Sequence, residues 1–219
     1  LSFCEDLTEK VLLQTQLVEN EKKFRTIFET AEEGICIVDR DEFITDVNQK
    51  FCQIVGYTKE EVLYQNFDDK FVHPDERENS TLEKKKIVSG EARVFERRLI
   101  KKDGTVIWVK VAAKGIFDEK GEFTGSFAFI TDITEQKKLQ EELTKSEAQF
   151  RSIWENSRDG MRLTDEVGNV ILVNKAFCDM VGLKREDIEN KSMADIYLVE
   201  NRSSILKKHQ RRFKSGNIK

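Results

Sequence analysis

The sequence predicts an α+β fold, a five-stranded antiparallel sheet with helices on one face. One observation is the order of segments, because two short β runs precede three helical segments and three further β runs follow. Strands and helices grouped in this way form an antiparallel sheet that the helices cover on one side. The other observation is that the same order begins a second time within the 219 residues, so one domain pattern is repeated.

The pattern begins with a β-hairpin and a short helix. The stretch GICIVDRDEFITDVN predicts two strands joined by a polar turn at residues 39–42. Asn48 is a good N-cap for the helix that follows, and Gly56 is expected to end it.

Two more helices and three strands complete the pattern. The stretch TKEEVL predicts a short helix capped by Thr58, and a longer helix begins near Pro74, the only proline, and stops at Gly90. The stretch RVFERRLIKKDGTVIWVKVAAKGIF predicts two strands around a turn at Asp103 and Gly104. DEKGEFTGSFAFIT then supplies a last turn and a last strand.

The two copies assign faces to the first strand, since side chains alternate along a strand. Ile35 and Ile37 correspond to apolar residues in the second copy, whereas Cys36 and Val38 correspond to polar ones. We therefore expect Ile35 and Ile37 to point to the helix-covered core, and Cys36 and Val38 to face a less demanding environment.

The repeat has a fixed offset, because Asp6 and Asp132 begin two similar helical stretches and no gap is needed from there onwards. A period this long indicates a duplicated domain. The chain is expected to be part of a longer array whose last module is incomplete and exposes its core. The predicted segments are the terminal strand of a preceding module at 1–6, a linker helix at 7–26, a complete module at 27–133, a second linker helix at 134–152 and the first half of a further module at 153–219.

Both linker helices carry apolar residues at alternating spacings of four and three, with Asn20 or Ser146 at the same place in each copy. This heptad pattern predicts a parallel homodimer of coiled-coil-like helices, because a polar seam position sets the register. The alternative is an amphipathic helix that packs on its own sheet. The residues of the predicted dimer seam are Leu13, Leu17, Phe24, Ile27, Leu139, Leu143, Phe150 and Ile153.

Each linker helix opens on Asp-x-Thr-Glu. The Asp or Thr side chain can cap free N–H groups, and the Glu lies three residues after the Asp, as in a capping box. This predicts a stiff joint that passes a strain in the sheet to the helix. The joint residues are Asp132, Thr134 and Glu135 in one copy and Asp6, Thr8 and Glu9 in the other.

Five motifs occur in order: GICIVD, DVNQKFCQIVGYTKEEVL, FVHPDE, RRLIKKDGTVIWVKV and GSFAFITDITEQKK. GMRLTD and LVNKAFCDMVGLKREDI repeat the first two. Over nearly the whole chain these motifs resemble tandem PAS domains with their C-terminal PAC segment. The resemblance implies a module that binds a small ligand or dimerises and relays a signal to an output enzyme outside this chain. A bacterial sensor histidine kinase is the favoured parent. The alternatives are a diguanylate cyclase parent and a ligand-free dimerisation or spacer module.

The resemblance also implies a pocket, although the same residues could simply fill the core. Arg97 shares a strand face with Phe95 and Leu99, and a charge turned toward a core needs a partner. We expect Arg97 to contact a buried carboxylate, to await an anionic ligand or to reach the rim. The candidate pocket residues are Ile35, Ile37, Val47, Phe51, Ile54, Val55, Phe71, Phe95, Arg97, Leu99, Val109 and Val111.

The residues carry no recognisable cofactor signature. LYQNFDDKF lacks the cysteine that resemblance to the light-sensing flavin class would require, and His73 and His209 are poor candidates for a haem ligand. The four cysteines form no CxxC pair for zinc. The sequence therefore favours no metal and no cofactor, and leaves an organic ligand or a loosely held flavin nucleotide open.

Composition and motifs argue against several function classes. Charged residues make up 36% of the chain with both signs interleaved and a net charge of -4, unlike the basic stripe of a nucleic-acid surface. No apolar run approaches the roughly 18 residues that cross a membrane. We expect no direct membrane contact and a cytoplasmic location. Phosphate-loop, kinase and cyclase motifs are missing, so no catalytic residue is expected in this segment.

Overall fold

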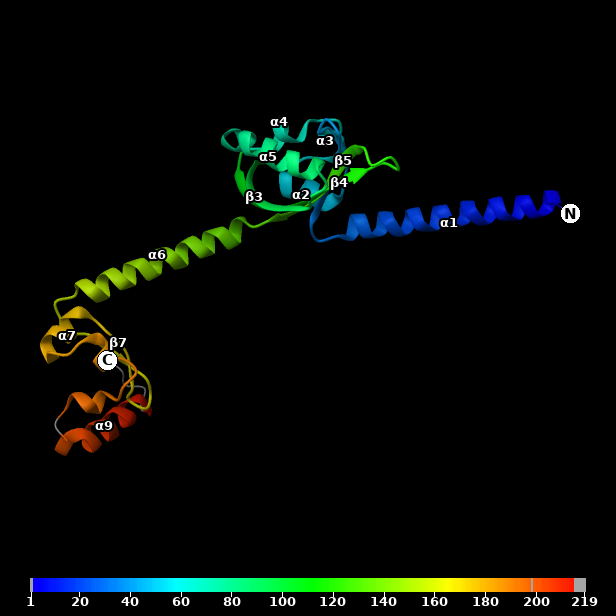
Figure 1. Cartoon of the computed structure of the whole chain (residues 1–219). Coiled ribbons are helices and arrows are strands. Elements are labelled where there is room, and N and C mark those ends of the chain that lie inside the picture. Colours follow the sequence, from blue (N-terminus) through cyan, green and yellow to red (C-terminus); the bar gives the residue numbers. More distant parts are fainter. Residues whose placement is uncertain (1, 198, 215–219) are drawn as a thin grey trace. The chain divides into compact units, whose positions relative to one another are not determined.

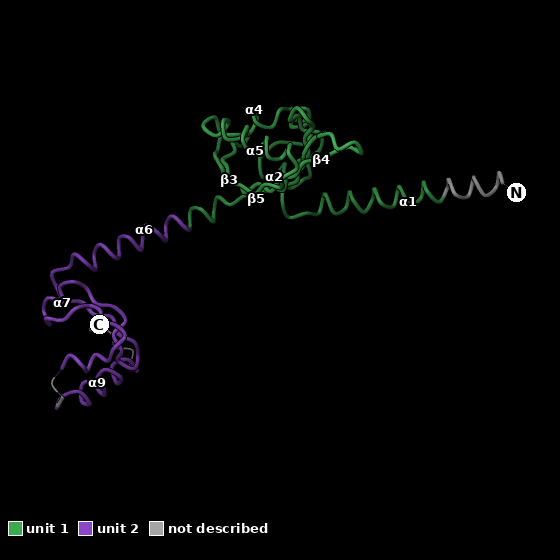
Figure 2. The backbone as a smooth tube through the Cα atoms, in the orientation of Figure 1, with its two compact units in different colours: residues 1–139 green, residues 140–219 purple. Residues whose placement is uncertain are grey.

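The computed structural model describes residues 2–197 and 199–214, with side chains described for residues 12–197 and 200–214. The chain divides into two compact units, Leu1–Leu139 and Gln140–Lys219 (Figure 2). The division falls inside helix α6 (Thr134–Asn156). No helix in the described part of the chain is long and apolar enough to span a bilayer.

Unit 1 confirms the predicted fold class. After helix α1 (Ser2–Thr30), five antiparallel strands form one sheet in the order β2-β1-β5-β4-β3. The strands are β1 (Gly34–Asp39), β2 (Ile44–Val47), β3 (Arg93–Ile100), β4 (Val106–Phe117) and β5 (Phe123–Asp132). The connection between β2 and β3 contains all the helices that cover the sheet.

These helices lie over one face of the sheet (Figure 1). They are α2 (Gln49–Val55), α3 (Lys59–Val62), α4 (Phe67–Phe71), a 3₁₀ turn η1 (Pro74–Glu76) and α5 (Arg77–Val88). Helix α4 is not among the predicted elements, because five residues are too few to show a helical period. Its start is nevertheless capped, since the Asn66 side chain accepts a hydrogen bond from the backbone N–H of Asp69.

The core lies between these helices and the sheet. Phe51, Phe71, Ile44, Leu99 and Ile130 are among its largest fully buried side chains. Helices from one connection and strands from the whole unit thus meet in a single apolar cluster.

The predicted faces of β1 are wrong. Cys36 belongs to the core cluster and Val38 packs against it, whereas Ile35 and Ile37 lie on the opposite face of the sheet. The register explains this, because Cys36 is directly opposite Ala128, and residues that face each other across two strands share a face. Polarity in the second copy was a poor guide, because the residue types of one strand do not reveal which strands pair beside it.

The predicted strand at residues 1–6 is also wrong, because α1 begins at Ser2. A strand needs a neighbour for its backbone hydrogen bonds, and none of the described strands pairs with this segment. A helix satisfies its backbone internally. Helix α1 extends to Thr30 and α6 to Asn156, in each case four residues beyond the predicted linker.

Unit 2 repeats the first half of this arrangement. Its two strands, β6 (Arg162–Thr164) and β7 (Val170–Val173), pair antiparallel and precede α7 (Lys175–Val181) and α8 (Arg185–Ile188). The 3₁₀ turns η2 (Met193–Ile196) and η3 (Val199–Asn201) lead to α9 (Arg202–Lys214).

The predicted helix signals hold in both copies. Asn48 caps α2 and Asn174 caps α7. In both cases the asparagine side chain accepts a hydrogen bond from the backbone N–H three residues later. Gly56 and Gly182 end these helices in the left-handed conformation, with φ values of 77° and 72°. Such φ values suit glycine, which has no Cβ to clash.

Candidate ligand site and relay joint

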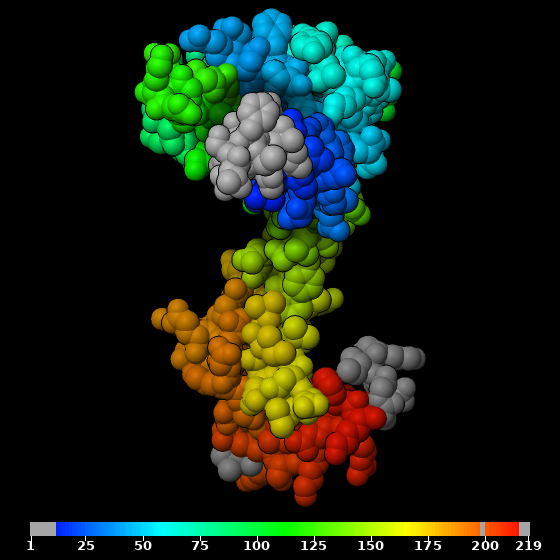
Figure 3. Space-filling model, turned by 90° about the vertical axis from the view of Figure 1, so that its right-hand side faces the viewer, coloured from blue at the N-terminus to red at the C-terminus, as the bar shows by residue number. Residues whose placement is uncertain are grey.

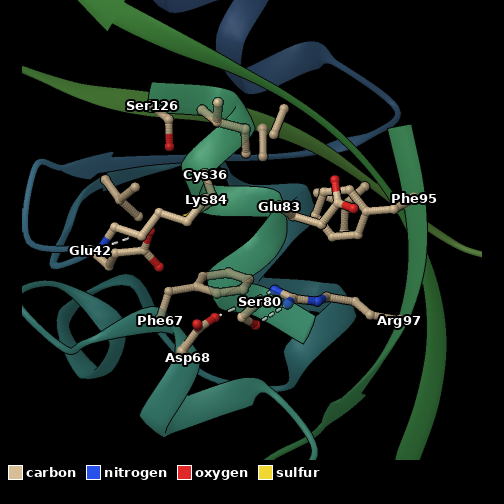
Figure 4. Close-up of a pocket in the computed structure, with 15 residues that line it drawn as sticks. Cys36, Glu42, Phe67, Asp68, Ser80, Glu83, Lys84, Phe95, Arg97 and Ser126 are labelled. Carbon is tan, nitrogen blue, oxygen red and sulfur yellow. Dashed lines mark hydrogen bonds and ion pairs between the residues drawn. The ribbon is translucent and has the colours of Figure 1, made fainter. Parts of the chain in front are cut away.

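A cavity lies between α5 and the inner face of the sheet in unit 1 (Figure 4). The cavity has a volume of about 60 Å³. The strands contribute mostly apolar side chains, such as Val111 and Ala113 of β4. The charged lining residues come from the β1–β2 turn, α4, α5 and β3, and are Glu42, Asp68, Glu83, Lys84 and Arg97.

The structure divides the predicted pocket residues into three groups. Phe95, Arg97 and Val111 line the cavity. Ile35 and Ile37 lie on the opposite face of the sheet. The others belong to the closed core, as the alternative interpretation expects, and are Val47, Phe51, Ile54, Val55, Phe71, Leu99 and Val109.

Arg97 contacts a carboxylate, that of Asp68, whose side chain is 25% exposed and not buried as the first of the three expectations had it. The Arg97 side chain is 9% exposed, and Nη1 lies 3.4 Å from Oδ1 of Asp68. Nη2 donates to the hydroxyl of Ser80 (Figure 4), and the guanidinium carbon of Arg97 lies 5.1 Å from the centroid of the Phe95 ring. Burial lowers the pKa of Arg97, while Asp68 and then Glu42 oppose that shift. Arg97 Nε is buried without a hydrogen-bond partner.

Glu42 supplies a second carboxylate to the cavity. It occupies the turn between β1 and β2 with a φ of 69°, a left-handed conformation uncommon for a residue with a side chain. Its carboxylate lies 3.3 Å from Nζ of Lys84. Burial, followed by the neighbouring Asp68 carboxylate, raises the pKa of Glu42.

Among the polar lining residues that sequence reasoning missed are Glu42, Asp68, Ser80 and Lys84. Each stands in a turn or a helix that reads as solvent-exposed when taken alone. The signal that could have found them is the internal repeat, because the second copy has a different residue type at every one of these positions.

The histidines lie outside the cavity lining. His73 caps η1, where its ring nitrogen accepts a hydrogen bond from the backbone N–H of Asp75. Nε2 of His209 lies 2.7 Å from the backbone oxygen of Asp165. Among the described residues, no three His, Cys, Asp or Glu side chains form a group that could hold a metal ion.

The joint between β5 and α6 is bonded to β4. The backbone N–H of Trp108 donates to Oγ1 of Thr134 over 3.0 Å, and that of Ile133 donates to the Trp108 carbonyl over 2.9 Å. Asp132 Oδ1 accepts from the backbone N–H of Thr134. Glu135 is exposed and its carboxylate bonds to no described N–H at the helix start, so the predicted capping box is not formed. Asp6, Thr8 and Glu9 lie on α1, but their side chains are outside the described residues.

The residues of the dimer seam are exposed along α1 and α6, whose described side chains lie on the surface in Figure 3. The exposed fractions of all eight side chains lie between 53% and 70%. Packing of these side chains on their own sheet, the alternative interpretation, is therefore not observed. Instead, Phe28 and Trp154, each four residues beyond a seam phenylalanine, are the buried contacts at the helix ends.

The chain matches the family model described as PAS fold over residues 22–133 and 148–218. The chain belongs to the PAS family. This PAS chain is 30% identical over 208 residues to sporulation kinase E of Bacillus subtilis (strain 168), covering 93% of the chain and 27% of the kinase. It is 28% identical over 147 residues to the probable diguanylate cyclase DgcE of Escherichia coli (strain K12), covering 63% and 13% respectively.

A solved structure of an RNA-binding light-oxygen-voltage receptor is similar with a TM-score of 0.51 and 21% identity, covering 58% of this chain and 37% of that one. At that identity the likeness shows the PAS fold alone. The chain spans about a quarter of the length of sporulation kinase E and less of DgcE.

Proposed function

We propose that this chain is a sensory and relay segment of a cytoplasmic signalling protein with PAS modules in tandem. A small ligand enters the cavity of unit 1 and changes the sheet, and α6 carries the change toward an output enzyme outside this chain. The observation that supports this most is that two strands, β4 and β5, contribute residues to both the cavity lining and the joint.

The path from cavity to joint is short. Val111 of β4 lines the cavity, and Trp108 of the same strand holds Thr134 and Ile133 at the start of α6. Ala128 of β5 also lines the cavity, and β5 runs directly into the joint at Asp132. A shift of either strand would therefore move the first turn of α6.

A histidine kinase is the proposed output enzyme. The similarity to sporulation kinase E extends over both units and the helix between them, since it covers 93% of the chain. The similarity to DgcE favours a diguanylate cyclase as the alternative output. A ligand-free spacer is the competing function, and it predicts that the bonds of the joint are unimportant for output.

A chimaeric kinase tests the relay. This chain would replace the matching segment of sporulation kinase E, and autophosphorylation would be measured for the native chain, Thr134→Val and Thr144→Val. Thr144 is the matched control, because its hydroxyl bonds only to the Gln140 carbonyl of its own helix. We expect Thr134→Val to change autophosphorylation by at least about fivefold, the lower range of coupling between sites. Equal activity of the two variants would support the spacer instead. The same chimaeras in DgcE, assayed for cyclase activity, identify the output that responds.

We further propose that the signalling form is a parallel homodimer joined along the dimer seam. Eight exposed apolar side chains in two matching helical stripes make a seam that a second copy would cover. The polar Asn20 and Ser146 at the same heptad position would fix the register.

Hydrodynamic mass of the whole chain tests the dimer. Lysine at Leu13, Leu17, Leu139 and Leu143 should reduce the mass to that of a monomer. The matched control places four lysines at exposed positions off the seam, namely Leu12, Val18, Gln140 and Thr144. A native mass for the seam variant would remove the dimer from the proposal.

A further inference from the structure

A groove of about 300 Å³ lies between α5 and β3, the strand at one edge of the sheet in unit 1. Its lining includes Leu82 and Glu83 of α5, Phe95 and Glu96 of β3, and Trp108 of β4. Glu83 and Phe95 are among the residues that line both this groove and the neighbouring cavity. We call it the edge groove. Its volume is that of a small ligand pocket.

The edge groove is open to solvent and partly apolar. Leu82 is 57% exposed, and Phe95 and Trp108 are half-buried. These three lining residues therefore keep apolar surface in contact with water. A molecule with an apolar part would gain free energy by covering that surface.

Most of the charges that line the edge groove are negative. Glu76, Glu83 and Glu96 are the carboxylates among its described lining residues, and Arg97 is the cation. Arg97 is already paired with Asp68. Glu76 and Glu83 each accept two hydrogen bonds from one arginine that is not among the described lining residues. The edge groove therefore favours a cation over an anion.

Glu96 is bound by an ammonium group, that of Lys137 at the start of α6. Nζ of Lys137 lies 2.5 Å from Oε2 of Glu96 and 5.2 Å from the centroid of the Trp108 ring. Organic ammonium ligands are held over aromatic ring faces, and carboxylates are the other strong partners of an ammonium. The lysine of the chain itself thus shows that Glu96 and Trp108 can hold such a group.

A ligand can replace the contact that Lys137 makes. The side chains of Lys137 and Glu96 are 42% and 45% exposed, and exposed ion pairs contribute little to stability. Lysine also binds a carboxylate as a point charge on a flexible chain, without the fixed fork of arginine. Glu96 is therefore easier to separate from its partner than Glu76 or Glu83.

The second module shows that the fold does not require acidic residues here. It has Arg202 and His209 at the repeat positions of Glu76 and Glu83. Both modules nevertheless form a helix at this place. The two carboxylates are thus particular to the first module, as expected of residues that serve a ligand and not the fold.

We propose that the edge groove binds a small organic ammonium compound, an amine with an apolar body. The ammonium replaces that of Lys137 between Glu96 and Trp108. The apolar body lies against Leu82 and Phe95. Binding releases one of the contacts between α6 and the sheet. This site is separate from the cavity of the proposed function and does not depend on a ligand there.

Three probes of similar shape test the class. Isopentylamine is a cation at neutral pH, isopentanol is its neutral counterpart and 4-methylpentanoate is its anionic counterpart. Each would be titrated into the whole chain while the NMR signal of the Trp108 indole N–H is followed. The chain has two tryptophans, so Trp154→Phe identifies that signal. We expect isopentylamine to shift it and to bind at least about tenfold more tightly than the other probes, a difference of about 1.4 kcal/mol.

Two substitutions with opposite effects locate the site. Glu96→Gln keeps the shape of the side chain but removes its charge, so the affinity for isopentylamine should fall at least about tenfold. Lys137→Met removes the competing ammonium. The affinity should then rise by about two- to fivefold, the range that exposed ion pairs cover.

Each substitution has a matched control. Glu119→Gln changes a carboxylate in the turn between β4 and β5, and Lys138→Met changes the lysine next to Lys137. Both positions are exposed, and neither is among the described residues that line the edge groove. Both controls should leave the affinity for isopentylamine unchanged.

Three results would overturn the inference. If isopentanol or 4-methylpentanoate binds the native chain at least as tightly as isopentylamine, the class of ligand is wrong. If Glu96→Gln does not weaken binding of isopentylamine, or Lys137→Met weakens it, the ligand does not take the place of the lysine. If no probe shifts the Trp108 signal in the native chain or in Lys137→Met, the edge groove is not a ligand site. The relay is judged separately, by the kinase chimaeras.

Discussion

Asn48 holds three elements together through one buried amide. Its Oδ1 accepts from the backbone N–H groups of Ile35 and Phe51, and its Nδ2 donates to the carbonyls of Phe28 and Glu33. The side chain is fully buried and satisfied. The sequence predicted only the N-cap bond, because the other partners come from segments whose positions the fold decides.

Asn48→Asp tests the donors separately from the cap. Aspartate caps a helix as well as asparagine does, but it would turn a carboxylate oxygen toward two carbonyls. We expect a loss of roughly 3 kcal/mol in the free energy of unfolding, measured with denaturant. Asn66→Asp, at the less buried cap of α4, should cost less than about 1 kcal/mol. Similar losses for both variants would contradict this role.

Glu42 predicts a pH dependence of stability. Burial, and next Asp68, raise the pKa of Glu42 above its ordinary value of 4.5. The folded chain therefore keeps this proton at pH values where the unfolded chain has released it. Its contribution to the free energy of unfolding falls as pH rises from about 4.5 through the raised pKa.

The matched variant is Glu42→Gln, which has no proton to lose. Relative to this variant, the native chain should lose stability as pH rises from about 4.5 through the raised pKa of Glu42. Denaturant unfolding at several pH values measures the difference between the two proteins. A difference that is constant with pH, or that grows in favour of the native chain, would contradict the assignment.

At the scale of elements, the start of α6 was predicted and its anchor was not. The Asp-x-Thr-Glu pattern indicated a stiff joint, and Asp132 and Thr134 do form bonds there. The partner, Trp108, lies 26 residues earlier on another strand. No local pattern contains that contact, because it depends on the register between β4 and β5.

Thr134→Val should loosen this joint. Valine keeps the shape of threonine but cannot accept from the backbone N–H of Trp108, which is then left without its partner. We expect the free energy of unfolding of unit 1 to fall by about 1–3 kcal/mol. Hydrogen exchange at the Trp108 amide should accelerate, whereas Thr144→Val should leave it unchanged. Continued slow exchange in Thr134→Val would show that the hydroxyl does not hold the strand.

At the scale of the whole molecule, the two units have the same local signals and unequal cores. Ile54 of unit 1 is 8% exposed, whereas Met180, its counterpart in unit 2, is 66% exposed. The sheet of unit 1 has five strands, and the described sheet of unit 2 has two. A two-stranded sheet whose packing helices leave apolar side chains exposed is marginally stable in water.

Hydrogen exchange should therefore separate the units. Strand β1 lies between β2 and β5, whereas its counterpart β6 pairs only with β7 among the described strands. We expect the amides of β6 to exchange at least about tenfold faster than those of β1, equivalent to about 1.4 kcal/mol. Equal exchange would mean that unit 2 gains protection from another source, such as a second copy.

The sequence by itself determined the elements whose signals are local. The N-caps at Asn48 and Asn174 and the left-handed glycines at Gly56 and Gly182 follow from residues within a few positions of one another. The fold class follows from the order in which such local segments succeed one another. Their repetition in a second copy made them easier to recognise. Such signals act through backbone conformation and neighbouring hydrogen bonds, so they do not need the rest of the fold.

Tertiary structure alone decided the face of β1, the partner of Thr134 and the composition of the cavity. Alternation along a strand gives two faces, but only pairing with β5 turned Cys36 toward the helices. In the same way, Arg97 of β3 contacts Asp68 and Ser80 because α4 and α5, which carry these two residues, pack against that strand. These contacts join residues far apart in the chain, and a burial pattern that depends on packing between distant segments cannot be read from either segment alone.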